Sequence, residues 1–139
     1  MAKSPNQKLK LLYLARYLMQ HSDEEHPVST AQIIEELARN DISAERKSIY
    51  DDIEALRNFG VDIIQVKGKN GGYYIASRNF ELPELKLLID AVLSSKFLTE
   101  KKSRELIEKL LNQCNEQEQC SANENTNHVF SPFVRGCRK

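Results

Sequence analysis

The chain has 139 residues, of which 40% are hydrophobic and 29% are charged, and its 20 basic residues balance its 20 acidic ones. This composition is typical of a soluble protein, and the length allows one small domain with appendages but not two independent cores. The sequence has no apolar run of membrane-spanning length, and its start, MAKSPNQKLK, lacks the apolar block of a signal peptide. We therefore expect a cytoplasmic protein.

The balanced charge is the main observation against nucleic-acid binding. Residues 1–80 do not change it, because they hold eleven basic and eleven acidic residues. The distribution of the charges along the chain matters more than their sum. A few phosphate contacts per subunit are enough to bind DNA when a dimer doubles them. We therefore expect salt-sensitive DNA binding, with a shallow slope of affinity against salt concentration.

A first helix is predicted over residues 8–20, after a loose arm in residues 1–7. Its apolar surface is unusually broad. One stripe, expected to pack on the following helices, consists of Leu11, Leu14, Ala15 and Leu18, and a second consists of Leu9, Tyr13 and Tyr17. The helix either meets the C-terminal helices or another subunit, or is simply well buried within one chain. The next loop contains His21 and His26, which we interpret as solvated because spacing supplies no third metal ligand.

A second helix is predicted to begin at Ser29, because Gln32 stands at the spacing of a capping box. Its apolar face consists of Ile33, Ile34 and Leu37. Asn40 and Asp41 are turn residues that end it, and Ile42 is the apolar plug expected inside such a turn.

A third helix is predicted over residues 44–59, with Ser43 as its N-cap and Gly60 as its stop. Its narrow buried stripe consists of Ile49, Ile53 and Leu56. The opposite side of its first two turns carries the groups that would enter a DNA major groove, namely Arg46, Lys47, Ser48 and Tyr50. These side chains suit guanine acceptors, phosphates and apolar base edges.

A β-hairpin is predicted next, because residues 62–66 and 73–76 are β-branched or aromatic runs that flank the turn sequence KGKNGG. Lys67 and Lys69 then lie at an exposed tip, where a cationic wing contacts phosphates. Tyr73 and Tyr74 point to opposite faces, so that one packs on the core and the other faces solvent or DNA. Together with the preceding helices, the hairpin predicts a winged helix-turn-helix.

The segment SIYDDIEALRNFGVDIIQVKGKNGGYYI resembles the N-terminal part of the WYL-domain transcriptional regulators, in which a Y-x-D-I-x-x-L helix precedes a wing ending in GGY. The resemblance covers residues 9–111, and it implies a DNA-binding regulator in which Tyr73 is structural. The residues that carry it are Tyr50, Asp52, Ile53, Leu56, Gly60, Gly71, Gly72 and Tyr73. Such regulators continue into an effector-sensing domain with the WYL tripeptide, which this sequence lacks. The chain is either a shortened relative or a cut one whose tail is not native.

Two further helices are predicted after a connector at residues 77–84, the first reaching residue 97 and the second capped by Thr99. Their apolar positions recur at helical spacing: Leu85, Leu88, Ile89, Val92 and Leu93, then Leu106, Ile107, Leu110 and Leu111. We expect an antiparallel hairpin whose apolar face the winged helix cannot fully cover. Dimerisation explains this economically and matches the two-fold symmetry of an operator, whereas docking on a partner or an absent domain is the competing explanation.

From about Asn115 the chain is rich in Asn, Gln, Glu and Ser without periodicity, which predicts a disordered or loosely attached tail. The cysteines, Cys114, Cys120 and Cys137, all lie there with His128. Their uneven spacing shows neither a CxxC pair nor a disulfide framework, so free thiols are favoured over a zinc site.

The sequence thus predicts a mostly α-helical fold with a small β-hairpin: a winged helix-turn-helix DNA-binding domain in residues 1–80, a helical hairpin in 81–113 and a polar tail in 114–139. The hairpin would serve dimerisation or link to a missing effector domain. The predicted DNA-binding residues are Ser29, Thr30, Ser43, Arg46, Lys47, Ser48, Tyr50, Lys67 and Lys69, the first two through the N-terminal turn of their helix.

The favoured function is a sequence-specific transcriptional regulator that binds double-stranded DNA as a homodimer, with no metal, cofactor or small-molecule site. The alternative is a winged-helix protein-interaction module that does not bind DNA, which the neutral charge favours, as do the acidic residues Glu45, Asp51 and Glu54. No P-loop, G-x-S-x-G, H-E-x-x-H or paired-cysteine motif indicates an enzyme.

Overall fold

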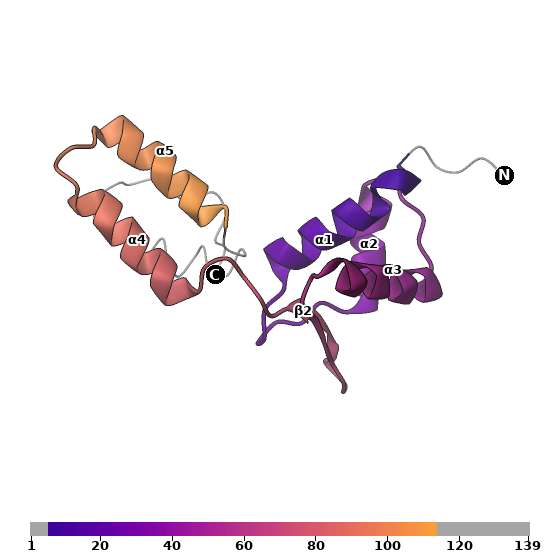
Figure 1. Cartoon of the computed structure of the whole chain (residues 1–139). Helices are drawn as coiled ribbons and strands as arrows, with labels where there is room; N and C mark the ends of the chain where they lie inside the picture. The colour runs from indigo at the N-terminus through magenta and orange to yellow at the C-terminus, as the bar shows by residue number, and fades with distance from the viewer. Residues whose placement is uncertain (1–5, 114–139) are drawn as a thin grey trace. The chain divides into compact units, whose positions relative to one another are not determined.

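The computed structural model describes residues 6–113, which fall into two compact units that divide after Ser77. The fold class is confirmed, because three helices are followed by a wing-like hairpin and a pair of helices (Figure 1). The elements are a 3-10 turn η1 (Gln7–Leu9), α1 (Lys10–His21), α2 (Thr30–Arg39), α3 (Arg46–Phe59), β1 (Ile63–Val66), β2 (Gly72–Ile75), α4 (Leu82–Ser94) and α5 (Glu100–Leu111). None of the helices between residues 6 and 113 is long and apolar enough to cross a membrane.

The core of the first unit lies where α1, α2 and α3 converge on the hairpin. Its fully buried side chains are Leu14, Leu18, Ile33, Leu37, Ile42, Ile49 and Ile53. The predicted stripes of α2 and α3 are therefore confirmed. On α1 the prediction was partly wrong: Leu11 is 38% exposed and Leu9 is 42% exposed, while Lys10 is buried. Helix α1 therefore buries Lys10 at its start, and its core residues are Leu14 and Leu18.

The start of α2 follows the predicted capping box. The Ser29 N–H donates to Gln32 Oε1 over 2.9 Å, and the Gln32 N–H donates to Ser29 Oγ over 3.2 Å. Two N–H groups that the helix cannot satisfy internally thereby gain partners. The helix ends at Asn40, and Asp41 adopts a left-handed φ of 58° that turns the chain toward α3.

The start of α3 differs from the prediction. Ser43 is not the N-cap; Glu45 holds that position, and the helix begins at Arg46. Ser43 lies in the turn itself, where its carbonyl accepts from Gln7 Nε2 over 2.9 Å and its side chain is exposed. Ile42, just before it, is buried as predicted. At the other end Gly60 has a φ of 114°, which confirms it as the helix stop.

The hairpin pairs β1 and β2 antiparallel, with Ile63 opposite Ile75 and Gln65 opposite Tyr73. Tyr73 also bridges to Val28, since each residue's N–H donates to the other's carbonyl over 2.8–2.9 Å. Tyr73 packs on the core, as predicted for one of the two tyrosines, and Tyr74 is half-buried. A Cβ at Gly72 would overlap the carbonyl oxygen of Val28, so this bridge requires glycine there.

In the second unit, α4 and α5 form the predicted helical hairpin around Ile89, Ile107 and Leu111. The Thr99 cap is confirmed, because its Oγ1 accepts from the Lys102 N–H over 3.3 Å. The predicted polar tail and all three cysteines lie outside the described residues. Within residues 6–113 no cluster of three metal-ligating side chains occurs.

Candidate nucleic-acid interface

The first turn of α3 presents its basic residues to solvent. The side chains of Arg46 and Lys47 are exposed, and Tyr50, one turn later, is 47% exposed. The buried stripe of Ile49 and Ile53 holds the opposite side of the helix on the core. The exposed face of α3 can therefore enter the major groove of B-DNA, which is wide enough to admit one α-helix.

Ser48, predicted to contact DNA, is half-buried and has a hydrogen-bond partner on α1. Lys10 Nζ donates to Ser48 Oγ and forms an ion pair with Asp52 Oδ2 at 2.6 Å. The side chains of Lys10 and Asp52 are only 8% and 20% exposed, so the pair is partly desolvated. These three residues, which we call the α1–α3 clamp, fix α3 against α1. Asp52 therefore positions α3 against α1.

The N-terminal segment also holds the turn between α2 and α3. Asn6 Nδ2 donates to the carbonyl of Asn40 over 3.1 Å, and Gln7 Nε2 donates to the carbonyl of Ser43 over 2.9 Å. The Ser43 side chain remains exposed beside the start of α3. Sequence reasoning missed these contacts, because the donors and acceptors lie more than thirty residues apart in the chain.

A shallow pocket of 250 Å³ separates α3 from the hairpin, and its lining residues are Tyr50, Ile53, Glu54, Arg57, Gln65 and Tyr73. Arg57 Nε donates to the Ile63 carbonyl over 2.9 Å, and this hydrogen bond joins the wing to α3. Burial, reinforced by Tyr50, raises the pKa of the Tyr73 hydroxyl above its ordinary value of 10.0, and Arg57 offsets part of this rise. Gln65, exposed on β1, is a candidate DNA contact that the sequence did not single out.

The wing projects away from the three helices (Figure 1). Lys67 and Lys69 are exposed at its tip, as predicted, on either side of Gly68, whose φ is 133°. Both ammonium groups can therefore bind phosphates without breaking a contact that stabilises the fold.

At the start of α2, the capping box already uses the backbone N–H and the hydroxyl of Ser29. The N–H groups of Thr30 and Ala31 belong to the same first turn and are not used by the capping box. A phosphate placed there would be bound by these two groups and not by Ser29.

One comparison with known proteins found a match over the first unit. Residues 13–69 match the family described as FokI, D3 domain, a helix-turn-helix-type DNA-binding domain of the kind found in the DNA-recognition part of a restriction enzyme. The match runs from α1 to the tip of the wing and covers less than half of the chain. It does not indicate a WYL regulator. Neither the curated proteins nor the solved structures gave a match.

Proposed function

We propose that this protein is a sequence-specific DNA-binding regulator of transcription. The observation that carries the proposal is the similarity of residues 13–69 to a DNA-binding helix-turn-helix-type domain, in a chain whose α3 exposes Arg46 and Lys47. In such domains the first turns of the second helix of the motif contact base edges. The regulatory role rests on the resemblance to the WYL-domain regulators and on the absence of a catalytic motif, and we place the protein in the cytoplasm.

The side chains divide between reading bases and holding the backbone. Arg46 and Lys47 are the groups suited to guanine acceptors, and Tyr50 is suited to a phosphate or an apolar base edge. Lys67 and Lys69 would neutralise flanking phosphates, with Thr30 adding a backbone N–H. Ser48 contributes indirectly, because its hydroxyl accepts the hydrogen bond from Lys10 that orients α3.

One observation favours a second function, that of a winged-helix protein-interaction module. Three carboxylates, Glu45, Asp51 and Glu54, are exposed on α3 beside the basic residues and would repel phosphates. Glu54 is partly neutralised by Arg57 at 3.3 Å, which weakens this objection. The two functions make different predictions about the same surface, so one set of experiments separates them.

Selection of bound fragments from random double-stranded DNA with the full chain tests the proposal. We expect an enriched consensus, and affinity for it that falls with salt. Arg46→Glu should weaken binding by about 100-fold, because it removes one base contact and adds a repulsive charge. Arg39→Glu is the matched control, since Arg39 is an exposed arginine of α2 paired with Glu35 and Glu36.

Failure to enrich any motif at low salt would contradict the proposal. DNA-independent retention of a protein partner, lost in Arg46→Glu but kept in Arg39→Glu, would then establish the interaction-module function. Replacing Lys67 and Lys69 by alanine tests the wing separately, because it should lower the salt slope by about two without changing the consensus.

A further inference from the structure

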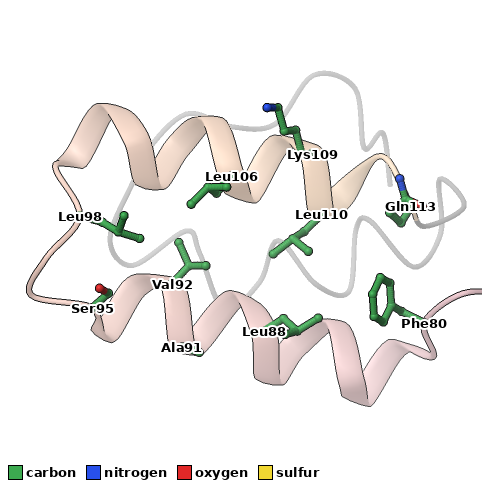
Figure 2. A pocket seen from close by; sticks show the side chains of 10 residues that line it. All are labelled: Phe80, Leu88, Ala91, Val92, Ser95, Leu98, Leu106, Lys109, Leu110 and Gln113. Carbon is green, nitrogen blue, oxygen red and sulfur yellow. The ribbon is translucent and has the colours of Figure 1, made fainter.

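The second unit contains an open apolar groove between α4 and α5 (Figure 2). Its volume is 610 Å³, and its lining residues are Phe80, Leu88, Ala91, Val92, Ser95, Leu98, Leu106, Lys109, Leu110 and Gln113. Figure 2 shows Leu106 and Leu110 of α5 on the side opposite Val92 of α4, with Leu98 on the loop that joins the two helices. Among the described lining residues only Lys109 is charged, so the surface suits an apolar partner.

Part of the apolar lining of this groove is exposed, since Leu88 is 37% exposed. The fully buried residues of α4 and α5 are Leu85, Ile89 and Ile107. A second helical hairpin is the partner that would complete a four-helix core.

We propose that the groove is occupied by the same groove of a second copy of this chain, forming a two-fold-symmetric four-helix bundle. Charge complementarity supports a self-partner in antiparallel orientation. The loop end of the hairpin, residues 95–102, is net basic, with exposed Lys96, Lys101 and Lys102 against Glu100. The open end, residues 80–86 and 108–113, is net acidic, with Glu81, Glu84 and Glu108 against Lys86 and Lys109.

Orientation follows from these charges. A two-fold axis across the middle of the hairpin places the basic loop end of one copy on the acidic open end of the other. A parallel arrangement would instead bring two basic ends together, which costs free energy. The proposal does not rest on DNA binding, although a dimer also supplies two recognition helices to a palindromic site.

Sedimentation equilibrium of the full chain tests the proposal. We expect a dimer at about 100 μM and dissociation on dilution. Ala91→Glu should weaken the dimer by about 100-fold or more, because the exposed Ala91 lies in the groove and the new carboxylate would be buried on association. Ser94→Glu is the matched control, since Ser94 is an exposed residue of the same helix that does not line the groove. Far-UV circular dichroism verifies that both variants keep their helices.

A charge-reversal variant tests the orientation. Lys96→Glu with Lys101→Glu should weaken an antiparallel dimer by about tenfold, but it would strengthen a parallel one by removing like-charge repulsion. A monomer at all concentrations up to about 100 μM overturns the proposal. A dimer that Ala91→Glu weakens no more than Ser94→Glu overturns it as well, because its interface would then lie elsewhere.

Discussion

Removal of the Lys10 ammonium group should destabilise the first unit markedly. In Lys10→Met the side-chain volume is nearly kept, but Asp52 and Ser48 lose the donor that lies between them. Breaking a fully buried pair costs about 3–5 kcal/mol, whereas an exposed pair is worth about 0–1 kcal/mol. Because the Lys10 and Asp52 side chains are 8% and 20% exposed, we expect a loss of about 2 kcal/mol between these limits.

Tyrosine fluorescence during urea unfolding measures this loss in the first unit alone. All five tyrosines lie between residues 13 and 74, and the chain has no tryptophan. Asp52→Asn should cost a similar amount. The double variant should cost less than the sum of the two single changes by about 1–2 kcal/mol, because the second change removes a partner already lost.

Arg39→Met is the control for the clamp. Its pair with Glu35 at 3.0 Å joins side chains that are 67% and 68% exposed, so we expect a loss of about 0.3 kcal/mol. A Lys10→Met variant no less stable than this control, or single losses that simply add, would refute the clamp as the device that holds α3 on α1.

Three further changes test the wing, the cap and the buried tyrosine. Gly72→Ala should cost about 1–3 kcal/mol in urea unfolding, because its methyl group overlaps the Val28 carbonyl, and an unchanged stability would contradict the bridge. Asn70→Ala, at the exposed tip, should be nearly neutral. Ser29→Ala should cost about 1 kcal/mol through the lost capping box, with a loss below about 0.3 kcal/mol arguing against it. The pKa of Tyr73 is raised in the folded state, so the stability that its neutral hydroxyl contributes is complete below pH 10.0 and declines as the pH rises further. In alkaline urea titrations, Tyr73→Phe should therefore lose stability less steeply than the wild type.

The local elements of the fold could be predicted from the sequence because neighbouring residues decide them. The capping box joins Ser29 to Gln32, three residues on, and the stop at Gly60 depends on one residue's freedom to adopt a positive φ. The turn sequence KGKNGG likewise gave the hairpin and its exposed lysines. The buried stripes of α2 and α3 follow from helical spacing in the same way.

What the sequence could not supply is the set of contacts between distant segments. Lys10 donates a hydrogen bond to Ser48, 38 residues away in the chain. Gln7 Nε2 donates to the carbonyl of Ser43, 36 residues away, and the N-cap of α3 is Glu45 and not the predicted Ser43. Leu11, predicted to be buried, is exposed, and its neighbour Lys10 is buried.

The sequence alone therefore determined which segments are helices, which is the hairpin and where the basic residues fall along them. Only the tertiary structure decided which face of α1 meets α3, and hence which polar side chains of α3 point outward. The physical reason is that helix starts, stops and turns depend on hydrogen bonds within a few residues. The choice of face depends instead on whether a partner charge tens of residues away is available to compensate the burial of Lys10.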